Sequence, residues 1–395
     1  MKKILALLMA ALFAVTTLGC DIVQEPGKVF YLNCIPEANE AWQKLAAAYS
    51  DLYGVEVTVR TVTDADCATA VRAALSWENA PTAFQFHDAS AFDQLKEYCT
   101  DLTGSAVLSQ MITGSFNLTD GGAVKAVSFS YDAFGLMVNT ALLQTAGYEL
   151  EDIQDFDALR AAAEDIHSRR DTLQFDAFCA LTAESAAVLP LADLAQLYKD
   201  ESGLYLFRRT LDLYLDNCTA SRTKSSVADA TLDQFAQAQA VFCPYSAGGY
   251  DVLVAGAYDM NAGDLAMIPL RFGAQGEEST ALSCIPRNYW AINAQSTEAD
   301  RKATADFLNW VVTSEYGISV LQEQFGGVPF KAADDTGFFG DSNALLSKGN
   351  APVILPNNTA EDNRAALVAA VTGYAANRTD ENWNKIKEAL GTDPA

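Results

Sequence analysis

Strand and helix patterns alternate over residues 28–87, and this alternation restricts the fold of the chain more than any other feature. The strand patterns are apolar or alternate between apolar and polar residues, and the segments between them carry apolar residues at helical spacing. The strand patterns cover 28–34, 55–62 and 82–87, and the helical patterns cover 41–53 and 65–77. Strands separated by helices are typical of a parallel sheet, so we predict an α/β protein.

The middle of the chain breaks this alternation. Two strand patterns, "AVKAVSFS" and "AFGLMVN", follow each other across Tyr131 and Asp132 with almost no loop between them. A helix-rich stretch follows at 156–235, further strand patterns occur at 239–244, 265–270 and 288–293, and further helical patterns occur at 297–312, 315–324, 360–375 and 381–390. We find no sequence repeat and no low-complexity linker, so a second domain must be interleaved with the first.

The first 20 residues have the pattern of an export signal. Two lysines precede an apolar run at 4–15, which is too short to cross a bilayer of roughly 30 Å as a helix. The sequence Leu18-Gly19-Cys20 is similar to a bacterial lipobox, in which cleavage leaves a lipidated N-terminal cysteine. We therefore predict a lipoprotein signal peptide at 1–20 and a tether at 21–27, with lipid on Cys20. The alternative is an ordinary secretory signal, which would release the protein.

Charge and length limit the partners and the size of the core. Removing the predicted signal peptide takes away two lysines and leaves 375 residues, of which 24 are basic and 51 acidic, for a formal charge of −27. A nucleic-acid partner is excluded because binding to phosphates requires a positive surface. Half of the chain is apolar, which is enough material for two compact lobes.

Seven cysteines remain after Cys20 is assigned to lipid. Their number is odd and no two form a C-x-x-C pair, so we expect neither a structural zinc site nor any other metal. An exported location permits disulfides, and Cys67 with Cys99 is the one pair that we consider. The alternative is that these residues are buried free thiols that pack as small apolar side chains.

The order of several short motifs resembles that of one known family. The motifs are "KVFYLN", "GVEVTV", "NAPTAFQF", "YDAFGLMVNTALLQTAGY", "FDALRAAAEDI", "NYWAIN", "FLNWVVTSEYG" and "GGVPFK", and they span nearly all of the mature chain. In this order they resemble the extracellular solute-binding proteins of carbohydrate ABC importers, the group that includes maltose-binding protein. The stretch "NTALLQTAGY" resembles the helix that follows the first hinge crossing in that family.

The resemblance implies a type II periplasmic-binding-protein-like fold, in which two interleaved α/β lobes close on a ligand in a central cleft. The chain would cross between the lobes near Tyr131, Met267 and Thr313. Lobe one would comprise 28–132 and 267–313, and lobe two 133–266 and 314–395. Such a protein is a monomer on the outer face of the cytoplasmic membrane, binds a carbohydrate without a cofactor, and passes it to ABC permease subunits.

Four acidic residues match the positions that bind sugar hydroxyls in this family. A carboxylate accepts hydroxyl hydrogen bonds, and such charge-assisted bonds are the stronger kind. The four residues are Glu37, Asp88, Asp132 and Glu184. Asp88 and Asp132 are the better candidates because each terminates a strand pattern. The alternative for any one of them is a solvated surface carboxylate or a helix cap.

Amide, imidazole and aromatic side chains near these acids are further candidates for ligand contacts. They are Gln85, His87, Asn288, Tyr289 and Trp290. Tyr289 and Trp290 point to opposite faces of a strand, so we expect one to reach the cleft and the other to enter the core.

Two departures from the family pattern leave the ligand open. Relatives usually stack a tryptophan on the sugar in the loop after strand 239–244, whereas this chain has "YSAGGYD", in which only Tyr245 and Tyr250 can substitute. Arg287 stands where close relatives tend to have an acid, and it either contacts an anionic ligand such as a uronic acid or pairs with an acidic side chain.

Two other classes of function remain as alternatives. A glycosidase needs two carboxylates across a cleft, and the candidate acids could supply them, although the chain has no G-x-S-x-G, H-E-x-x-H, P-loop or G-x-G-x-x-G motif. A surface lipoprotein that serves adhesion or assists a sensor is the third class. It would act without a permease.

Overall fold

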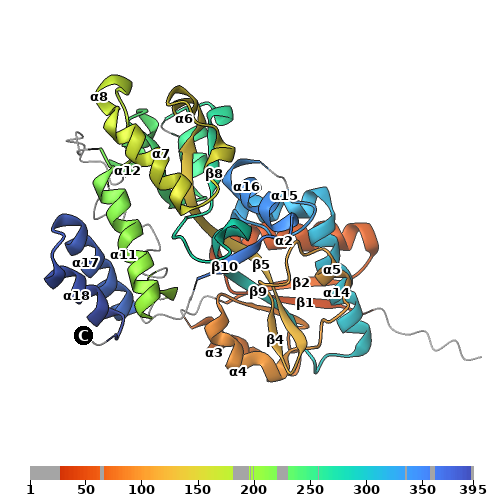
Figure 1. The fold of residues 1–395 in the computed structure, drawn as a ribbon. Coiled ribbons are helices and arrows are strands. Elements are labelled where there is room, and N and C mark those ends of the chain that lie inside the picture. The colour runs from red at the N-terminus through yellow and green to blue at the C-terminus, as the bar shows by residue number, and fades with distance from the viewer. Residues whose placement is uncertain are drawn as a thin grey trace, which may run out of the picture.

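The computed structural model shows two α/β lobes that are joined by long shared strands (Figure 1). It describes residues 27–62, 66–180, 195, 197–198, 200–219, 230–256, 258–333, 336–355 and 361–392. The strand order through the main sheet is β2-β1-β3-β9-β5-β7-β6. The interleaved α/β architecture predicted from the sequence is therefore confirmed.

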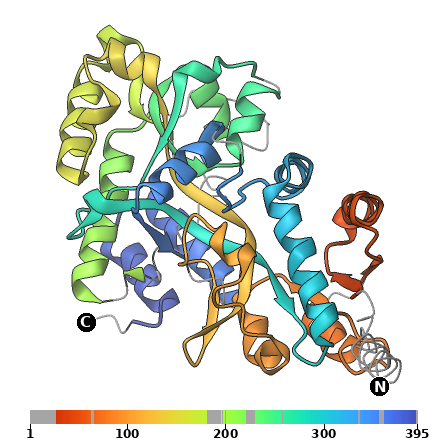
Figure 2. The same cartoon turned by 90° about the vertical axis from the view of Figure 1, so that its right-hand side faces the viewer.

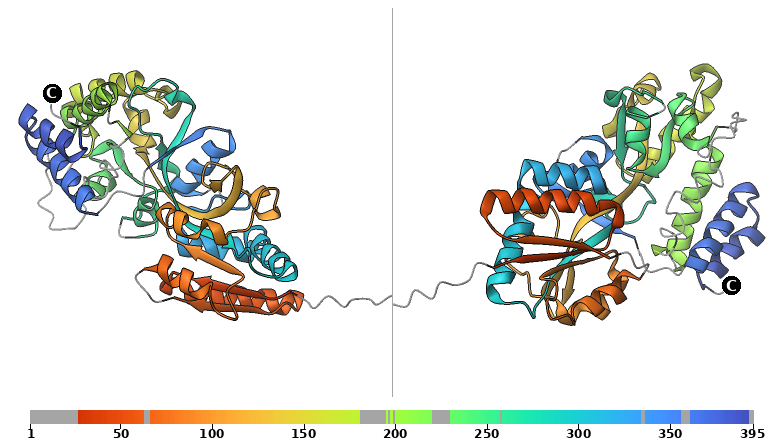
Figure 3. Two further views of the ribbon diagram at one scale, coloured as in Figure 1. Left: turned by 90° about the horizontal axis from the view of Figure 1, so that it is seen from below. Right: turned by 180° about the vertical axis from the view of Figure 1, so that it is seen from behind.

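Lobe one is built on the alternating elements of the N-terminal segment. The strands β1 (Val29–Asn33), β2 (Val57–Thr61) and β3 (Ala83–Phe86) are parallel, and the helices are α2 (Asn39–Tyr53), α3 (Cys67–Ala74), α4 (Phe92–Leu95) and α5 (Ala106–Ser109). Helix α2 lies across β1 and β2 (Figure 3). It buries one face at helical spacing, through Trp42, Leu45, Ala46 and Tyr49, and it ends at Gly54, whose φ of +67° suits glycine.

Two strands run through both lobes and connect them. Strand β5 (Ala123–Asn139) is continuous for 17 residues, so the two strand patterns on either side of Tyr131 form one element. It pairs in antiparallel register with β9 (Thr280–Ile292) from Val127 opposite Trp290 to Phe134 opposite Ser283. Its first residues pair with β4 (Leu118–Asp120), and its last residues pair with β7 (Ala240–Ser246) and β8 (Leu265–Ile268). Figure 2 shows β5 passing from one lobe into the other.

Lobe two surrounds the C-terminal half of β5. Its elements are α6 (Thr140–Thr145), α7 (Phe156–Ser168), α8 (Arg170–Leu173), β6 (Asp176–Phe178), α11 (Glu201–Asp216), α12 (Ala230–Ala236), α13 (Gly249–Val254), α17 (Glu361–Ala376) and α18 (Asp380–Ala389). The last two helices pack beside α11 (Figure 1), where Arg208 pairs with Asp380 at 2.9 Å and Tyr374 donates to Asp212 at 2.8 Å. The C-terminal hairpin of helices thus closes the outer side of this lobe.

The second chain crossing lies later than predicted. Met267, in β8, pairs with Met137 in the second half of β5. The carbonyl oxygen of Phe272 accepts from Arg209 of α11 at 2.8 Å, and Glu277 accepts from the backbone of Phe156 at 2.8 Å. Residues 267–279 therefore belong with lobe two, and the chain returns to lobe one along β9.

The third crossing also lies later than predicted. The helices α14 (Glu298–Thr313) and α15 (Glu315–Phe325) both pack on lobe one, where the Phe325 ring lies 6.5 Å from Trp42. Phe330 stacks on Trp290 at 6.2 Å. The crossing follows these residues and leads to α16 (Gly337–Ser347) and to β10 (Ala351–Ile354), which pairs with β9. Periodicity locates such elements but does not say which lobe they join.

One disulfide joins the end of β1 to the start of α3. It links Cys34 with Cys67, so the predicted pairing of Cys67 with Cys99 is wrong. Cys99 is a buried free thiol that donates to the carbonyl oxygen of Leu95 at 3.3 Å. Cys179 and Cys284 are also buried free thiols, and Cys243 is buried too, as the alternative of small apolar side chains expects. No helix within the described ranges is both long and apolar enough to span a membrane.

Candidate ligand-binding site at the strand crossing

Polar side chains gather where the end of β3 meets the crossing strands. His87 and Asp88 directly follow β3, Asp132 lies in the middle of β5, and Arg287 and Asn288 lie in β9. In open α/β sheets, ligands bind beyond the carboxyl ends of the strands. The sheet order places β3 next to β9 and β9 next to β5, so residues from three distant parts of the sequence meet here.

Asn288 connects the three strands through its backbone and its side chain. Its N–H donates to the carbonyl oxygen of His87 at 2.8 Å, and its side-chain amide donates to the Ser130 hydroxyl at 2.8 Å. Its Oδ1 lies 3.2 Å from Nδ1 of His87. Its φ of +52° lies in the left-handed region, which asparagine adopts more readily than most residues other than glycine.

Arg287 pairs with the candidate acid Asp132. The guanidinium Nε lies 3.0 Å from Oδ2 of Asp132, and the side chains are 37% and 48% exposed. The alternative of an acidic partner for Arg287 is therefore confirmed. A pair this exposed contributes little to stability, about 0–1 kcal/mol. Both groups reach solvent, and the pair cancels most of the local charge.

Trp290 and Gln85 belong to the core of lobe one rather than to the cleft. Trp290 is 1% exposed, stacks on Phe129 at 4.3 Å and donates to the Tyr31 hydroxyl at 3.0 Å. Gln85 is fully buried and accepts from the same hydroxyl of Tyr31. The prediction that Gln85 contacts ligand is wrong, because all four residues of β3 are buried and neither face is open.

Tyr289 lies on the opposite face of β9, at the border of the site. It stacks on Phe86 at 5.4 Å and is 3% exposed. Burial raises the pKa of Tyr289; the nearby Asp88 carboxylate raises this pKa further, and the Arg287 guanidinium lowers it. The Tyr289 hydroxyl therefore stays protonated and neutral between the two charged groups.

A cavity of 420 Å³ adjoins this cluster. Its size is that of a small-ligand pocket, and its walls combine apolar surface with hydroxyl, amide and carboxylate groups. It is lined by Ala89, Ser90, Asp93, Ser115, Phe116, Asn117, Leu118, Pro286, Tyr289, Ile354 and Leu355. The wall thus includes Pro286 of β9, beside Arg287, and residues at the end of β10.

The remaining candidate acids have different surroundings. Glu37 lies in the 3₁₀ turn η1 (Pro36–Ala38) after β1 and is exposed. Oδ1 of Asp88 accepts from the backbone N–H of Ser90 at 2.9 Å and caps the turn η2 (Ala89–Ala91). The alternative interpretation of Asp88, that it is a cap, is therefore confirmed. Glu184 lies outside the described residues.

The two candidate tyrosines have different surroundings, and Tyr245 does not share a face with Asp132. Tyr245 pairs with Gly135, three residues after Asp132 in β5, so its side chain lies on the other face of the sheet. It is 7% exposed. The Tyr250 ring packs against Phe338 at 5.1 Å. Tyr245 is therefore a core residue, whereas Tyr250 is half-buried on α13, so only Tyr250 stays a candidate for the stacking ring.

Two buried serines on β5 support the site from within the sheet, and the sequence analysis missed them. Ser128 and Ser130 lie on the same face as Asp132, and the Ser128 hydroxyl donates to the carbonyl oxygen of Arg287 at 2.9 Å. The alternation S-x-S-x-D in "SFSYD" could have indicated that Ser128, Ser130 and Asp132 share one face of the strand. Within the part of the chain that the structure describes, no group of three or more His, Cys, Asp or Glu side chains is arranged to hold a metal ion.

Two lobes joined by shared strands, with polar side chains at the junction, define a hinged binding protein. The family model described as "Bacterial extracellular solute-binding protein" matches residues 44–344. The chain belongs to this family, and the resemblance seen in its motifs is confirmed. Members of the family are receptors for solutes, not enzymes.

Solved structures with the same fold cover nearly the whole chain. An extracellular solute-binding protein family 1 from Alicyclobacillus acidocaldarius aligns with a TM-score of 0.70 and 14% identity over 93% of this chain and 99% of that chain. Apo RafE from Streptococcus pneumoniae aligns with a TM-score of 0.67 and 12% identity over 93% and 98%. A cyclic α-maltosyl-1,6-maltose binding protein from Arthrobacter globiformis aligns with a TM-score of 0.60 and 17% identity over 92% and 98%. No curated protein matches the sequence significantly.

Proposed function

We propose that this protein is a lipid-anchored receptor that captures a sugar or oligosaccharide by hinge closure and delivers it to an ABC permease. The lipid on Cys20 would hold it on the outer face of the bacterial cytoplasmic membrane. The observation that carries the ligand proposal is the row of planar polar side chains at the strand crossing, with Asp132, Arg287 and Asn288 at its centre. The adjoining cavity of 420 Å³ supports it.

The chemistry of this row suits hydroxyl groups. Carboxylate, guanidinium, amide and imidazole groups offer donors and acceptors in fixed planes, which is how paired sugar hydroxyls are recognised. The pairing of Arg287 with Asp132 leaves no unbalanced positive charge for an anionic ligand. We therefore favour a neutral sugar over a uronic acid.

Closure follows from the position of these residues on the connecting strands. Asp132 and Arg287 sit where β5 and β9 pass from lobe one to lobe two. A ligand that contacts both lobes binds the closed form more tightly than the open form, so it shifts the hinge equilibrium toward closure. A permease can then distinguish the loaded receptor from the empty one.

The ligands of similar structures support a carbohydrate. RafE has been solved in complex with raffinose, and AcbH is described as having an exclusive preference for β-D-galactopyranose. These receptors share the fold at 11% and 14% identity. Their identity is too low to transfer either ligand to this chain, so we propose only the class.

A thermal-shift screen over mono- and oligosaccharides tests the proposal. A ligand at 100 times its dissociation constant is expected to stabilise the folded protein by about 2.7 kcal/mol. Small-angle scattering with the best ligand is expected to show a smaller radius of gyration. Stabilisation by amino acids or peptides, with none by any sugar, would contradict the carbohydrate assignment.

A further inference from the structure

Lobe two contains a second cavity, at the end of the molecule away from the strand crossing. It has a volume of 340 Å³ and is lined by His167, Arg170, Asp171, Gln174, Phe175, Asp176, Cys218, Thr219 and Gln239. Asp176 pairs with Ala240 at the start of β7, whereas the end of β7 pairs with Phe134 near the crossing. The cavity therefore lies at the opposite edge of the lobe-two strands from the proposed sugar site.

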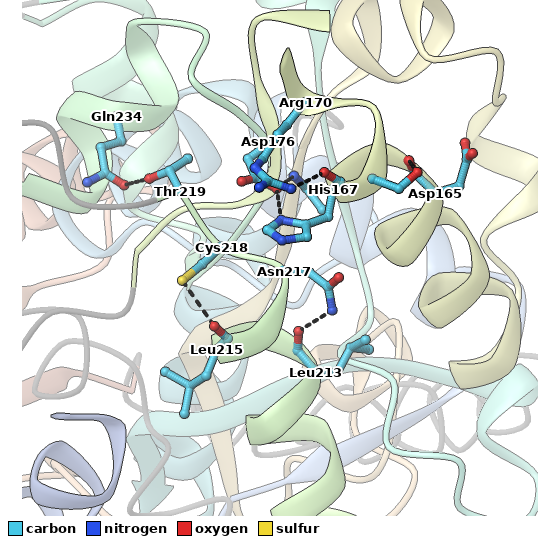
Figure 4. A network of polar contacts seen from close by, with 12 residues as sticks. Asp165, His167, Arg170, Asp176, Leu213, Leu215, Asn217, Cys218, Thr219 and Gln234 are labelled. Carbon is cyan, nitrogen blue, oxygen red and sulfur yellow. Dashed lines mark hydrogen bonds and ion pairs between the residues drawn. The ribbon is translucent and has the colours of Figure 1, made fainter. Parts of the chain in front are cut away.

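A histidine–aspartate pair forms one wall of this cavity. Nδ1 of His167 lies 2.8 Å from Oδ1 of Asp176, which also accepts from the backbone N–H of Ala177 at 2.7 Å (Figure 4). Asp176 is 5% exposed, and the His167 side chain is 28% exposed. With Nδ1–H donating to the carboxylate, neutral His167 has Nε2 left as an acceptor.

The other walls supply donors and acceptors of several kinds. Arg170 donates to the carbonyl oxygen of His167 at 2.8 Å, which holds its guanidinium beside the pair. The Thr219 hydroxyl donates to Gln234 at 3.0 Å and is itself able to accept. Gln174 and Gln239 add amides, and Phe175 adds an aromatic surface. Nearly every lining group can form hydrogen bonds with a ligand.

The charges of the cavity select against ions. An anion would meet the carboxylates of Asp171 and Asp176, and a simple cation would meet the guanidinium of Arg170. A metal ion lacks a donor set, since the described residues hold no group of three or more His, Cys, Asp or Glu side chains suited to one. Charged groups of both signs, planar polar groups and one aromatic ring are instead suited to a neutral ligand rich in hydroxyl groups.

We propose that this cavity is a second ligand site that binds a neutral, hydroxyl-rich molecule about the size of one sugar ring. The volume lies within the range of small-molecule sites, which is about 300–1,000 Å³. The site is separate from the strand crossing, so it does not depend on the proposed function and can be filled in the open or the closed receptor.

The two histidines of the chain provide separate reporters for the two sites. The sequence has only His87, at the crossing, and His167, in the second cavity. Protein labelled with ¹³C in its histidine rings is therefore expected to give two ring signals, which His87→Gln and His167→Gln assign. D-Glucose, D-galactose, maltose and myo-inositol are titrated at constant pH, with sodium sulfate and ammonium chloride as ionic controls.

The expected result is a saturable shift of the His167 signal with at least one of the four hydroxyl-rich probes and with neither salt. Gln239→Trp, which fills the cavity, is expected to abolish this shift and to leave the His87 titration unchanged. Arg170→Ala is expected to weaken the binding seen at His167 by about tenfold, the effect of one charge-assisted hydrogen bond. Thermal melting of both variants confirms that they are folded.

Three results would overturn the proposal. In the first, the His167 signal does not move with any of the four probes. In the second, it moves with a salt but not with a hydroxyl-rich probe. In the third, its shift persists unchanged in both folded variants. The His87 signal is judged independently of the His167 signal. A response at His87 alone supports the crossing site and rejects the second cavity. A response at His167 alone supports the second cavity and gives no support to the crossing site.

Discussion

Asp132 forms an ion pair with Arg287 and is also accessible to solvent. Its carboxylate pairs with Arg287 at 3.0 Å and is 48% exposed, so it can bind a ligand hydroxyl without breaking the fold. We predict that Asp132→Ala weakens sugar binding by about 1–3 kcal/mol, the loss expected for a hydrogen bond to a charged group. Isothermal titration with the best ligand of the screen measures this.

Asp306→Ala is the matched control for this variant. Asp306 also lies in an exposed ion pair, with Lys302, but on the outer helix α14. It is expected to bind the ligand as the unchanged protein does. Equal affinities of the Asp132 and Asp306 variants would show that the crossing does not contact the ligand.

Asp341 gives a pH dependence to stability. Burial raises the pKa of its carboxyl from 3.8 to about 6, and the N–H that Met267 donates to it at 2.8 Å lowers this pKa only in part. Because the folded state holds the proton more tightly than the unfolded state, the contribution of Asp341 to stability is full below pH 4 and is lost as pH rises through 6.

We predict that Asp341→Asn removes this loss and is more stable than the unchanged protein at pH 7, by an amount on the order of 1–2 kcal/mol. The asparagine keeps an acceptor for Met267. Urea unfolding of both proteins from pH 4 to pH 7 measures the difference. A difference that stays constant over this range would mean that Asp341 titrates normally in the folded state.

At the scale of elements, the disulfide ties the end of β1 to the start of α3. Cys34 and Cys67 are 33 residues apart, and closing a loop of this length in the unfolded chain is worth about 3–4 kcal/mol. We predict that the double variant Cys34→Ser, Cys67→Ser loses about this much stability, as measured by urea unfolding. A reductant is expected to destabilise the unchanged protein but not the variant. A reductant effect of the same size on both proteins would contradict this assignment.

The sequence predicted most elements because their periodicity reflects one buried face. Helix α2 and strands β1, β2 and β3 were found in this way, close to their observed bounds. The boundaries between the lobes could not be found in this way, because they depend on contacts between distant residues, such as that of Arg209 with Phe272. Gln85 was misassigned because in a fully buried strand a core amide has the same pattern as a ligand contact.

The candidate site was predictable only in part. His87, Asp132, Arg287 and Asn288 do meet at the crossing, although only His87 follows a strand end and β9 runs antiparallel to both β3 and β5. No sequence pattern shows the left-handed conformation of Asn288 or the pairing of Tyr245 with Gly135 of β5, which excludes Tyr245 from this face. These features emerge only when β5, β7 and β9 are aligned.

At the scale of the whole molecule, the proposed lipid anchor would set where the receptor works. We predict that Cys20→Ala releases the protein from membranes or blocks its processing, because the proposed lipid would be attached to this thiol. Ligand affinity is expected to stay the same, since the lobes begin only at β1. Membrane fractionation and titration of the released protein measure both effects. Unchanged membrane association would show that Cys20 is not the anchor.

The position of β9 in the sheet also affects how the protein can be made. This strand lies between β3 and β5, and it is synthesised only after roughly three quarters of the chain. The sheet of lobe one therefore lacks a central strand until late in translation. Phe330, which packs on Trp290, is synthesised later still. Domains usually fold as units once their last segment is available. The nascent chain should thus remain unfolded for most of its synthesis, the state in which an exported polypeptide can thread through a narrow translocation channel.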